Sequence, residues 1–280
     1  MASVNSPFRK VIKPVIMKLL GPGAYRWFFL RGKIRDIDRR LVEEAEMALL
    51  PRLIGPRDTV IDVGANFAYY TVRMAGLCPQ GKVLAFEPIP ATFEACRRIV
   101  RHYGLANVEV RAQGVGERAE TRRFEVPLQE LGTHSAGQAH LAGRDNRLAG
   151  HEKYHAFTRH ESFDCEIVAL DGLLPLLGPV SFVKIDIEGA ELFALKGMRG
   201  LIARDRPTLL LEVCTFFLKG FGITEQELSD WLTEQGYSAY AYEPRSGKLQ
   251  PAGVPFADGN YLFVHREKIA GLADLVVTHA

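Results

Sequence analysis

The chain has 280 residues, 47% of them hydrophobic, and a formal net charge of +2. This length and composition predict one large domain with a full hydrophobic core, and the near-neutral charge gives no general case for binding nucleic acid. The four cysteines form no C-x-x-C pair and lack zinc-ligand spacing, so we expect reduced core thiols. No apolar run approaches the roughly 20 residues of a membrane span, and no signal peptide is recognisable, so we expect a cytoplasmic protein.

Residues 1–54 are interpreted as a basic, amphipathic helical extension. Residues 1–40 contain ten Lys or Arg against two Asp, a local excess of +8. Apolar residues between positions 11 and 20 fall on one helical face, and the aromatic run Trp27-Phe28-Phe29 follows. This pattern is typical of a helix on an anionic membrane, but also of one that packs on the domain or on a second subunit; we favour packing or a homodimer. Residues 37–54 predict a second helix, closing over the ligand-binding edge of a sheet.

From residue 55 to residue 266, short β-branched runs alternate with longer helical patterns. This alternation is typical of a parallel sheet with crossover helices. Predicted parallel strands are Thr59–Val63, Lys82–Phe86, Val108–Gln113, Phe182–Ile187 and Thr208–Val213, and a late pair at Tyr237–Tyr242 and Tyr261–His265 predicts a hairpin at the sheet edge. Helical spacing covers residues 67–77, 91–103, 189–203 and 225–235; Thr224 and Glu227 predict a capping box at the start of the last helix. We therefore predict an α/β domain over residues 55–266, followed by a tail at 267–280.

Residues 127–165 do not fit this alternation. The segment is rich in Gly, Ala and polar residues and shows no sustained period. It contains five of the eight histidines: His134, His140, His151, His155 and His160. We predict a long loop or lid here, because loops of this length in compact domains are usually functional or disordered. The histidines lack the i, i+4 pairing with a carboxylate that a helical metal site shows, so we expect no metal.

The first predicted strand ends on Asp62 and a glycine turn, Gly64-Ala65-Asn66. In an open α/β sheet, ligands bind beyond the carboxyl ends of the strands, so such a turn would present backbone N–H groups and Asp62 to a polar ligand. A simpler interpretation is that Gly64 makes a tight turn and that Asp62 caps the next helix. A single glycine motif does not decide between them.

The second strand ends on Glu87-Pro88, 25 positions after Asp62. A carboxylate at this strand tip accepts hydrogen bonds from the ribose hydroxyls of a nucleoside ligand. A nicotinamide dinucleotide also needs G-x-G-x-x-G against its pyrophosphate, whereas the corresponding positions here are Gly64, Asn66 and Tyr69. S-adenosylmethionine has a ribose and a sulfonium but no phosphate, and it suits two strand-tip carboxylates better.

The segments "DVGANFAYYT", "VLAFEPIP", "VALDGLL", "FVKIDIEGAE" and "RPTLLLEV" resemble, in order, the motifs of the FkbM-type S-adenosylmethionine-dependent methyltransferases. The resemblance implies a class I methyltransferase, Rossmann-like fold with a seven-stranded, mostly parallel sheet, a final antiparallel strand and helices on both faces. It also implies S-adenosylmethionine as cofactor. The residues expected to bind it are Asp62, Gly64, Ala65, Asn66, Tyr70, Thr71, Glu87, Pro88, Gln113, Gly114, Val115 and Asp186. The chain departs from the family at Ala68, where the family usually has Gly.

The candidate catalytic residues are Asp186, Glu188, Glu212 and His134. Asp186 and Glu212 end predicted strands and Glu188 lies in the following turn, so they are candidates to accept the proton of an acceptor hydroxyl. His134 lies in the predicted lid. Structural alternatives remain: Glu212 in a buried ion pair with Lys184 or Arg206, and each histidine as a solvated side chain.

The sequence thus predicts O-methylation of a hydroxyl on a sugar-containing or polyketide-like small molecule. An NAD-linked oxidoreductase is an alternative that the missing third glycine and the lack of a recognisable hydride-transfer site disfavour. A non-catalytic nucleoside-binding module of the same fold is another, and retention of the strand-tip carboxylates together argues against it. Expected partners are therefore a small-molecule acceptor and no nucleic acid, with a homodimer or a peripheral membrane contact as open possibilities.

Overall fold

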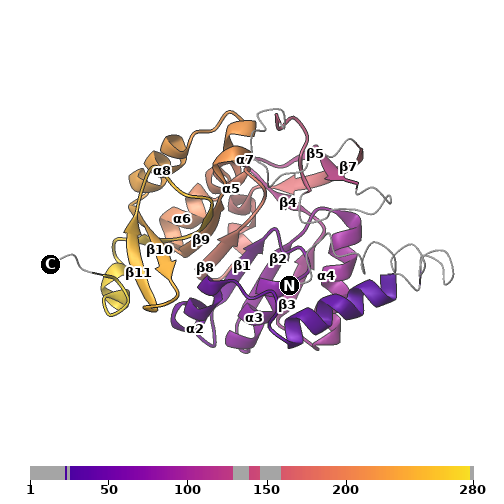
Figure 1. Ribbon diagram of the computed structural model, residues 1–280, viewed down its shortest axis with the longest axis horizontal. Coiled ribbons are helices and arrows are strands. Elements are labelled where there is room, and N and C mark those ends of the chain that lie inside the picture. The colour runs from indigo at the N-terminus through magenta and orange to yellow at the C-terminus, as the bar shows by residue number, and fades with distance from the viewer. Residues whose placement is uncertain (1–22, 24–25, 129–138, 146–158, 278–280) are drawn as a thin grey trace.

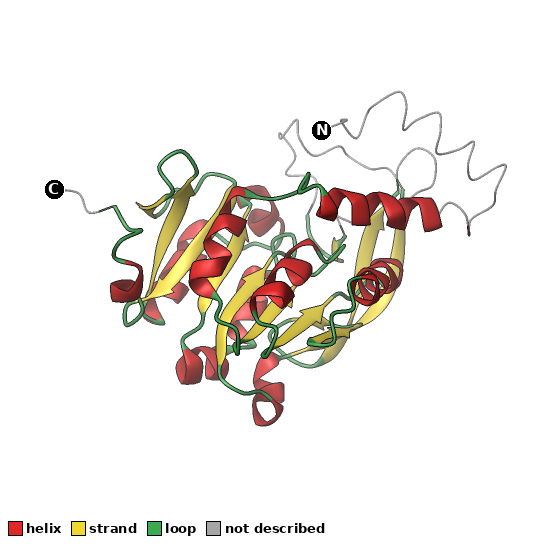
Figure 2. Ribbon diagram, turned by 90° about the horizontal axis from the view of Figure 1, so that it is seen from below, coloured by secondary structure: helices red, strands yellow, loops and turns green. Residues whose placement is uncertain are grey.

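The computed structural model describes residues 23, 26–128, 139–145 and 159–277. Its main sheet has eight strands in the order β11-β10-β12-β9-β8-β1-β2-β3, with helices on both faces (Figures 1 and 2). These strands are β1 (Thr59–Val63), β2 (Lys82–Phe86), β3 (Val108–Arg111), β8 (Val180–Ile185), β9 (Thr208–Val213), β10 (Tyr237–Glu243), β11 (Lys248–Ala252) and β12 (Gly259–His265). Strands β3, β2, β1, β8 and β9 pair in parallel, and β12 is antiparallel to both its neighbours. The predicted mostly parallel sheet with a final antiparallel strand is confirmed.

The late strands differ from the predicted edge hairpin. Strand β12 runs between β9 and β10, and β11 pairs with the outer edge of β10 as an eighth strand. In β11 only Leu249 is buried, and Pro251 lies within the strand. A short edge strand that contains proline carries little of the alternating pattern that identifies strands, so the sequence does not predict it.

The helices divide between the two faces of the sheet. The α-helices with labels are α2 (Leu50–Leu53), α3 (Tyr69–Leu77), α4 (Pro90–His102), α5 (Glu191–Lys196), α6 (Arg199–Asp205), α7 (Thr215–Gly220) and α8 (Glu225–Glu234). The 3-10 helices are η1 (Ala45–Leu49), η4 (Leu170–Leu176) and η5 (Ile269–Leu272). Buried residues of α5, α6 and α8 join one hydrophobic cluster, whereas those of α3 and α4 join two others. The core therefore lies in two layers, one on each face of the sheet.

The helix predicted over residues 189–203 is two helices, α5 and α6, separated at Gly197. A Cβ atom at Gly197 would overlap the carbonyl oxygen of Gly116. The amide of Asp171 also donates to the Gly197 carbonyl, at 3.0 Å. The break is set by this close tertiary approach, which helical periodicity cannot reveal.

The single helix predicted over residues 37–54 is wrong. Residues 26–38 form a helix (indigo in Figure 1), the chain turns at residues 39–42, and η1 and α2 follow. Arg40 adopts a positive φ of 55°, and Pro51 lies in the first turn of α2. Proline lacks a backbone N–H and fits only the start of a helix, so residue 51 begins a new one.

The long loop predicted at residues 127–165 is also wrong in part, because strands lie at its ends. A second sheet has the order β4-β7-β5-β6 and consists of β4 (Gly114–Val115), β5 (Glu120–Pro127), β6 (His140–Leu141) and β7 (His160–Val168). Strands β5 and β7 pair antiparallel along the full length of β5, from Glu120 opposite Ile167 to Pro127 opposite His160. Residues 129–138 and 146–158, with His134, His151 and His155, lie outside the described residues.

The described part of the chain has no helix long and apolar enough to cross a membrane.

The helix α8 begins with the predicted capping box. The hydroxyl of Thr224 accepts from the amide of Glu227 at 3.1 Å, and the Glu227 carboxylate accepts from the amide of Thr224 at 2.7 Å. This confirms both the start of α8 and the reason for it, because two otherwise unpaired amides are satisfied reciprocally.

Replacing Thr224 with Ala is expected to lower the free energy of unfolding by about 1 kcal/mol, because the cap acceptor is lost. Urea denaturation measures this change. Thr233→Ala is the matched control, since Thr233 is exposed near the end of the same helix. Equal losses in the two variants would show that the cap does not stabilise α8.

Candidate active site

The carboxyl ends of four adjacent strands bring acidic side chains to one edge of the main sheet. Asp62 lies in β1, Glu87 follows β2, Asp186 follows β8 and Glu212 lies near the end of β9. Strand β1 lies between β2 and β8, with Asp62 in register with Ala85 on one side and Lys184 on the other. These carboxylates thus share the crevice in which α/β sheets bind ligands, although they are up to 150 positions apart in the sequence.

The turn after β1 joins the ends of β1, β2 and β8. Gly64 has a φ of 82°, and a Cβ atom there would overlap the carbonyl oxygen of Asp186. The amides of Gly64 and Ala65 donate to the carbonyl of Phe86, at 3.0 and 2.9 Å. The prediction that this turn presents those two amides to a ligand is therefore wrong for the free protein, because β2 already accepts from them. What requires glycine at residue 64 is the positive φ and the close approach of β8.

Asn66 and Ala68 complete the turn in left-handed conformations, with φ of 47° and 60°. Ala68 is fully buried and packs in the cluster that contains Ile34, Ile37 and Phe67. A left-handed alanine costs about 1–2 kcal/mol relative to the ordinary helical region. Ala68 thus keeps the left-handed conformation that the family's usual glycine favours, and its methyl group packs in the core.

Glu87 closes the turn from the side of β2. Its carboxylate accepts from the amide of Asn66 at 3.1 Å and from the amide of Ile89 at 2.9 Å. Burial raises the pKa of Glu87 to about 7, although these two amides oppose the rise. Each carboxylate oxygen has further acceptor capacity. Glu87 is therefore a fixed acceptor that titrates near neutrality.

A buried ion pair lies behind the turn. The Lys184 ammonium donates to Asp186 at 2.7 Å and lies 4.8 Å from the centre of the Tyr70 ring. Burial alone lowers the pKa of Lys184, but the carboxylates of Asp186 and Asp62 outweigh it and raise the pKa. Asp62 is fully buried and accepts from the hydroxyl of Thr71 at 2.5 Å. The alternative pairing of Lys184 with Glu212 is thus replaced by a pairing with Asp186, and Arg206 instead pairs with Glu267.

Glu191 shapes the turn that carries Glu188. Its carboxylate accepts from the amides of Ile187 and Gly189, both at 3.1 Å, and burial raises its pKa to about 7. Glu188 has a φ of 59° and Gly189 a φ of 100°. Glu191 therefore has a structural role, and the left-handed backbone that it supports directs Glu188 toward the other carboxylates.

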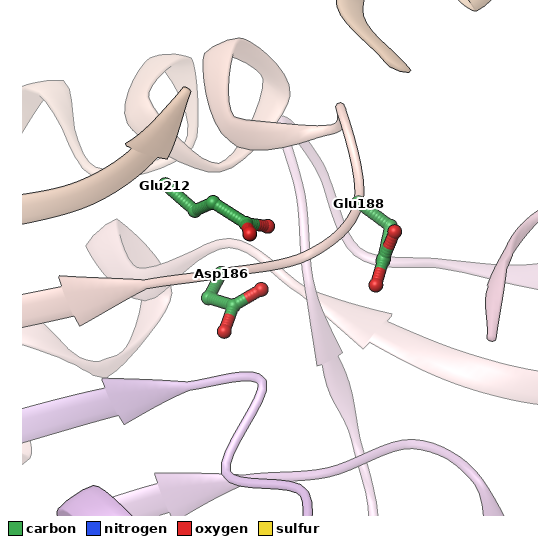
Figure 3. A group of neighbouring side chains, drawn as sticks. All are labelled: Asp186, Glu188 and Glu212. Atoms are coloured by element: carbon green, nitrogen blue, oxygen red, sulfur yellow. The ribbon is translucent and has the colours of Figure 1, made fainter. Parts of the chain in front are cut away.

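Asp186, Glu188 and Glu212 gather at the ends of β8 and β9 (Figure 3). Each contributes a carboxylate oxygen, and these three oxygens lie within 4.8 Å of one another. Burial, followed by the charges of Asp186 and Glu188, raises the pKa of Glu212 to about 10. Burial would raise the pKa of Asp186 too, but Lys184 holds it below its ordinary value. At neutral pH Glu212 is thus protonated and can donate to the Asp186 carboxylate.

Arg144 approaches this cluster from the segment after β6, a contact that the sequence pattern does not indicate. Its guanidinium donates to the backbone carbonyl of Glu188 at 2.9 Å and lies 4.3 Å from the centre of the Phe217 ring. Its Nη1 is also 3.8 Å from the carboxylate of Glu188. Burial raises the pKa of Glu188 well above its ordinary value, and Arg144 opposes that rise.

The other predicted site residues have contacts of their own. The hydroxyl of Tyr70 donates to Glu44 at 2.8 Å, and the side-chain amide of Gln113 donates to Glu166 at 3.1 Å. Gly114 and Val115 form β4, beside Ile167 of β7. Among the described lid histidines, His140 is buried with Nε2 3.7 Å from a Glu125 carboxylate oxygen, and His160 is exposed in β7. These two histidines belong to the second sheet.

Unsatisfied acceptors identify the kind of ligand that fits. Buried oxygens without a hydrogen-bond partner in the described part of the chain include Oδ1 of Asp62, Oδ1 of Asn66 and Oε2 of Glu188. The oxygens of Asp62 and Asn66 need donors or positive charge, because an unpaired buried acceptor is costly. Oε2 of Glu188 already lies 3.8 Å from Nη1 of Arg144. S-adenosylmethionine offers an ammonium, two ribose hydroxyls and a sulfonium, so the residues present fit this cofactor. Asp62 and Asn66 would hold its amino acid end and Glu87 its ribose.

Comparison with known proteins identifies the family. A family model, the methyltransferase FkbM domain, matches residues 62–239. The chain belongs to the FkbM methyltransferase family. "Methyltransferase 1" of Beauveria bassiana is 26% identical over 50% of this chain and 57% of its own length, and "Methyltransferase sdnD" of Sordaria araneosa is 27% identical over 50% and 60%. The chain thus spans less than two thirds of either curated relative.

A solved FkbM methyltransferase from Methylobacillus flagellatus KT is 16% identical, with a TM-score of 0.46; the likeness covers 76% of this chain and 44% of that one. Membership of the family rests on the family match. Residues 62–239 are therefore a methyltransferase domain of the FkbM family, whose cofactor is S-adenosylmethionine. This agrees with the donors and positive charge that the buried acceptors require.

The pKa of Glu87 leads to a test of its ribose-binding role. An ionised carboxylate accepts ribose hydroxyls better than a protonated one, so affinity for S-adenosylhomocysteine is expected to rise as pH increases through about 7 and then to level off. Calorimetry at a series of pH values on either side of neutrality measures this affinity. Glu87→Ala should weaken binding at least tenfold, since a hydrogen bond to a charged group contributes about 1.5–3 kcal/mol.

Glu87→Gln should remove this pH dependence. Glu191→Gln is the matched control, because Glu191 is buried and also has a pKa of about 7, but it binds the 187–189 turn. If the pH dependence persists in Glu87→Gln and disappears in Glu191→Gln, the ribose assignment is wrong.

Lys184→Met is expected to lower the free energy of unfolding by about 3–5 kcal/mol, because Asp62 and Asp186 lose their buried counter-charge. Chemical denaturation measures the loss, and adding Asp186→Asn should recover part of it. Lys82→Met is the control: Lys82 lies 2.7 Å from Glu109 but is 47% exposed, so the expected change is within about 1 kcal/mol. A similar loss in both single variants would contradict the role given to burial.

Proposed function

We propose that the protein transfers a methyl group to a hydroxyl of a sugar-containing or polyketide-like small molecule. The observation that carries this proposal is the group of Asp186, Glu188 and Glu212 at the ends of β8 and β9, beside the residues that would hold the cofactor. A hydroxyl is a weak nucleophile that must lose a proton as it is methylated. Carboxylates within hydrogen-bond reach orient it and accept that proton.

When bound, S-adenosylmethionine supplies an electrophilic methyl group on a positively charged sulfur. The described residues around the site contribute an excess of carboxyl groups, so this positive charge is favoured there. Asp186 has a lowered pKa and is ionised at neutral pH, whereas Glu212 is protonated. We therefore assign Asp186 as the proton acceptor and Glu212 as the group that orients it.

A lowered pKa does not disqualify Asp186 from this role. The O–H of the acceptor becomes strongly acidic as its oxygen gains the methyl group, so the proton moves late and a weakly basic carboxylate accepts it. What Asp186 adds is position, because Lys184 donates to its Oδ2 and Glu212 also bonds its carboxylate. Correct alignment of the reacting groups can supply several kcal/mol.

The alternatives are separable by binding and turnover. An NAD-linked oxidoreductase would bind NAD, for which the Gly64-Asn66-Tyr69 positions lack the pyrophosphate cradle. A non-catalytic module would bind S-adenosylmethionine without turnover. Screening glycosides, polyketides and primary amines with methyl-labelled S-adenosylmethionine tests the proposal by mass spectrometry. Label found on nitrogen, or none on any acceptor despite cofactor binding, would refute the hydroxyl assignment.

Asp186→Asn keeps the shape of the side chain but removes its charge and basicity. The single-turnover rate at saturating cofactor is expected to fall about 10²-fold or more, with a smaller loss of cofactor affinity. His134→Ala, in the predicted lid, should mainly raise the acceptor KM. Rapid-quench kinetics and calorimetry measure the two quantities.

The pH profile distinguishes Asp186 from its neighbours. With Asp186 as base, the rate at saturating cofactor stays level near neutrality, because the pKa of Asp186 lies below its ordinary value. With Glu212 as base, the rate instead rises with pH through neutrality, because burial raises its pKa to about 10. With Glu188 as base, the rise lies at a higher pH than for an ordinary glutamate, because burial raises its pKa too. Such a rise, abolished by Glu188→Gln or Glu212→Gln, would overturn the assignment of Asp186.

A further inference from the structure

The helix over residues 26–38 has two faces with different surroundings. Ile34 and Ile37 are buried in the cluster that contains Phe67 and Ala68, so this face packs on the domain. The apolar residues at positions 11–20, for which the sequence predicts packing, lie outside the described residues. The other face is not part of that cluster. Its aromatic residues, Trp27 and Phe28, are 54% and 45% exposed. Packing on the domain therefore explains only half of the helix.

The exposed face combines aromatic rings with positive charge. The rings of Trp27 and Phe28 are in edge contact at 4.9 Å, and the Arg31 guanidinium lies 5.3 Å from the Trp27 ring centre. Arg35 lies one turn beyond Arg31 and is exposed as well. Trp and Phe beside Arg are typical of helices that lie in the interface of a lipid bilayer. We call these four residues, Trp27, Phe28, Arg31 and Arg35, the outer face of the helix.

We propose that the outer face of this helix docks on an anionic membrane surface. Charge complementarity favours this occupant, because residues 1–40 carry a net charge of +8 while the rest of the chain carries −6. Anionic headgroups attract such a basic segment, and the two aromatic rings can bury in the interface. The remainder of the chain, which is net negative, gives no reason for the protein to bind lipid through another part.

A second copy of the chain is the rival occupant, and charge disfavours it. In a twofold-symmetric dimer the same patch lies on both sides of the interface. Arg31 and Arg35 of one copy would then face the same arginines of the other, with Asp38 as the acidic residue nearby on this helix. An anionic surface attracts the positive charges of Arg31 and Arg35, whereas in a dimer these arginines would repel those of the second copy.

Docking here would bring the cofactor turn close to the lipid. Phe29 packs against Phe67 with ring centres 5.3 Å apart, and the Lys33 ammonium lies 4.3 Å from the Phe67 ring centre. Phe67 lies between Asn66 and Ala68 in the turn that follows β1. The helix thus has the headgroups on one side and this turn on the other, a separation of about 10 Å, the diameter of a helix. Acceptors that partition into membranes would be concentrated beside the site.

Vesicle sedimentation of the full chain tests the proposal. The protein should bind vesicles of phosphatidylcholine with phosphatidylglycerol and sediment with them. Added salt should release it, because screening weakens attraction to exposed charges. Vesicles of phosphatidylcholine alone should not. Trp27→Ser/Phe28→Ser and Arg31→Glu/Arg35→Glu should each reduce the bound fraction at least tenfold. Circular dichroism and S-adenosylhomocysteine affinity should be unchanged.

Matched controls separate the outer face from general charge and exposure. Arg118→Glu/Arg245→Glu makes the same charge change at exposed sites elsewhere, and Leu176→Ser removes an apolar side chain that is 75% exposed. Both should retain vesicle binding. The chain has two tryptophans, and Trp231 is only 8% exposed. Docking should therefore shift the emission of Trp27 to the blue, and Trp27→Phe should abolish this shift.

Several results would overturn the proposal. One is the absence of binding to anionic vesicles, and another is equal loss in the control variants. A third is vesicle binding that survives both outer-face variants but disappears when residues 1–22 are deleted. Concentration-dependent dimerisation in light scattering, abolished by Trp27→Ser/Phe28→Ser in a protein that does not bind vesicles, would assign the face to a second copy.

Discussion

The buried ammonium of Lys184 is the charge on which the strand-end cluster depends. It lies in β8 opposite Asp62 of β1 and two residues before Asp186, so strand register and the two-residue period of the sheet bring both carboxylates to it. Two buried carboxylates next to each other repel and lose their hydration, and the intervening cation offsets both costs. The close meeting of β1 and β8 at Gly64 requires this neutralisation.

Compensation by Lys184 is incomplete, and the excess of acid groups has a chemical consequence. Asp186 remains ionised, while Glu212 retains a proton because burial and its two acidic neighbours oppose its charge. The cluster of Asp186, Glu188 and Glu212 thus keeps the negative charge of Asp186 while Glu212 stays neutral beside it. A site of this kind favours a positively charged ligand even though not all of its carboxyl groups are ionised. The sulfonium of the family's cofactor meets this condition.

Sequence reasoning located the strand ends because both signals there are local. Buried parallel strands are continuous apolar runs, and an acidic residue at the end of each run is visible without knowing its neighbours. The break at residues 39–51 carried a local signal too, Pro51, which favours the start of a helix over its interior. The second sheet carried no such signal. Strands β5 and β7 combine exposed and buried residues without a sustained apolar run and are rich in charged residues, and their pairing joins residues about 40 positions apart.

The contacts of the site residues were the least accessible to sequence reasoning, since they depend on which partner each group meets in space. The glycine turn predicts free amides at Gly64 and Ala65, but the carbonyl of Phe86 accepts from both. Arg144 has no neighbouring motif, and its contact with the turn of Glu188 follows only from the path of the chain after β6. The residue in the sequence that reflects this contact is Gly220, because a Cβ atom there would overlap the Arg144 side chain.

Residues outside the matched family segment also support the site. Glu44, which precedes residue 62, accepts from the hydroxyl of Tyr70 and from the side-chain amide of Asn260, both at 2.8 Å. Asn260 lies in β12, beyond residue 239. Tyr70 in turn presents its ring to the Lys184 ammonium. The two flanks of the family segment therefore meet at one carboxylate and hold the aromatic wall of the buried ion pair. The contacts around the buried ion pair at the end of β8 thus extend to the chain on either side of the matched segment.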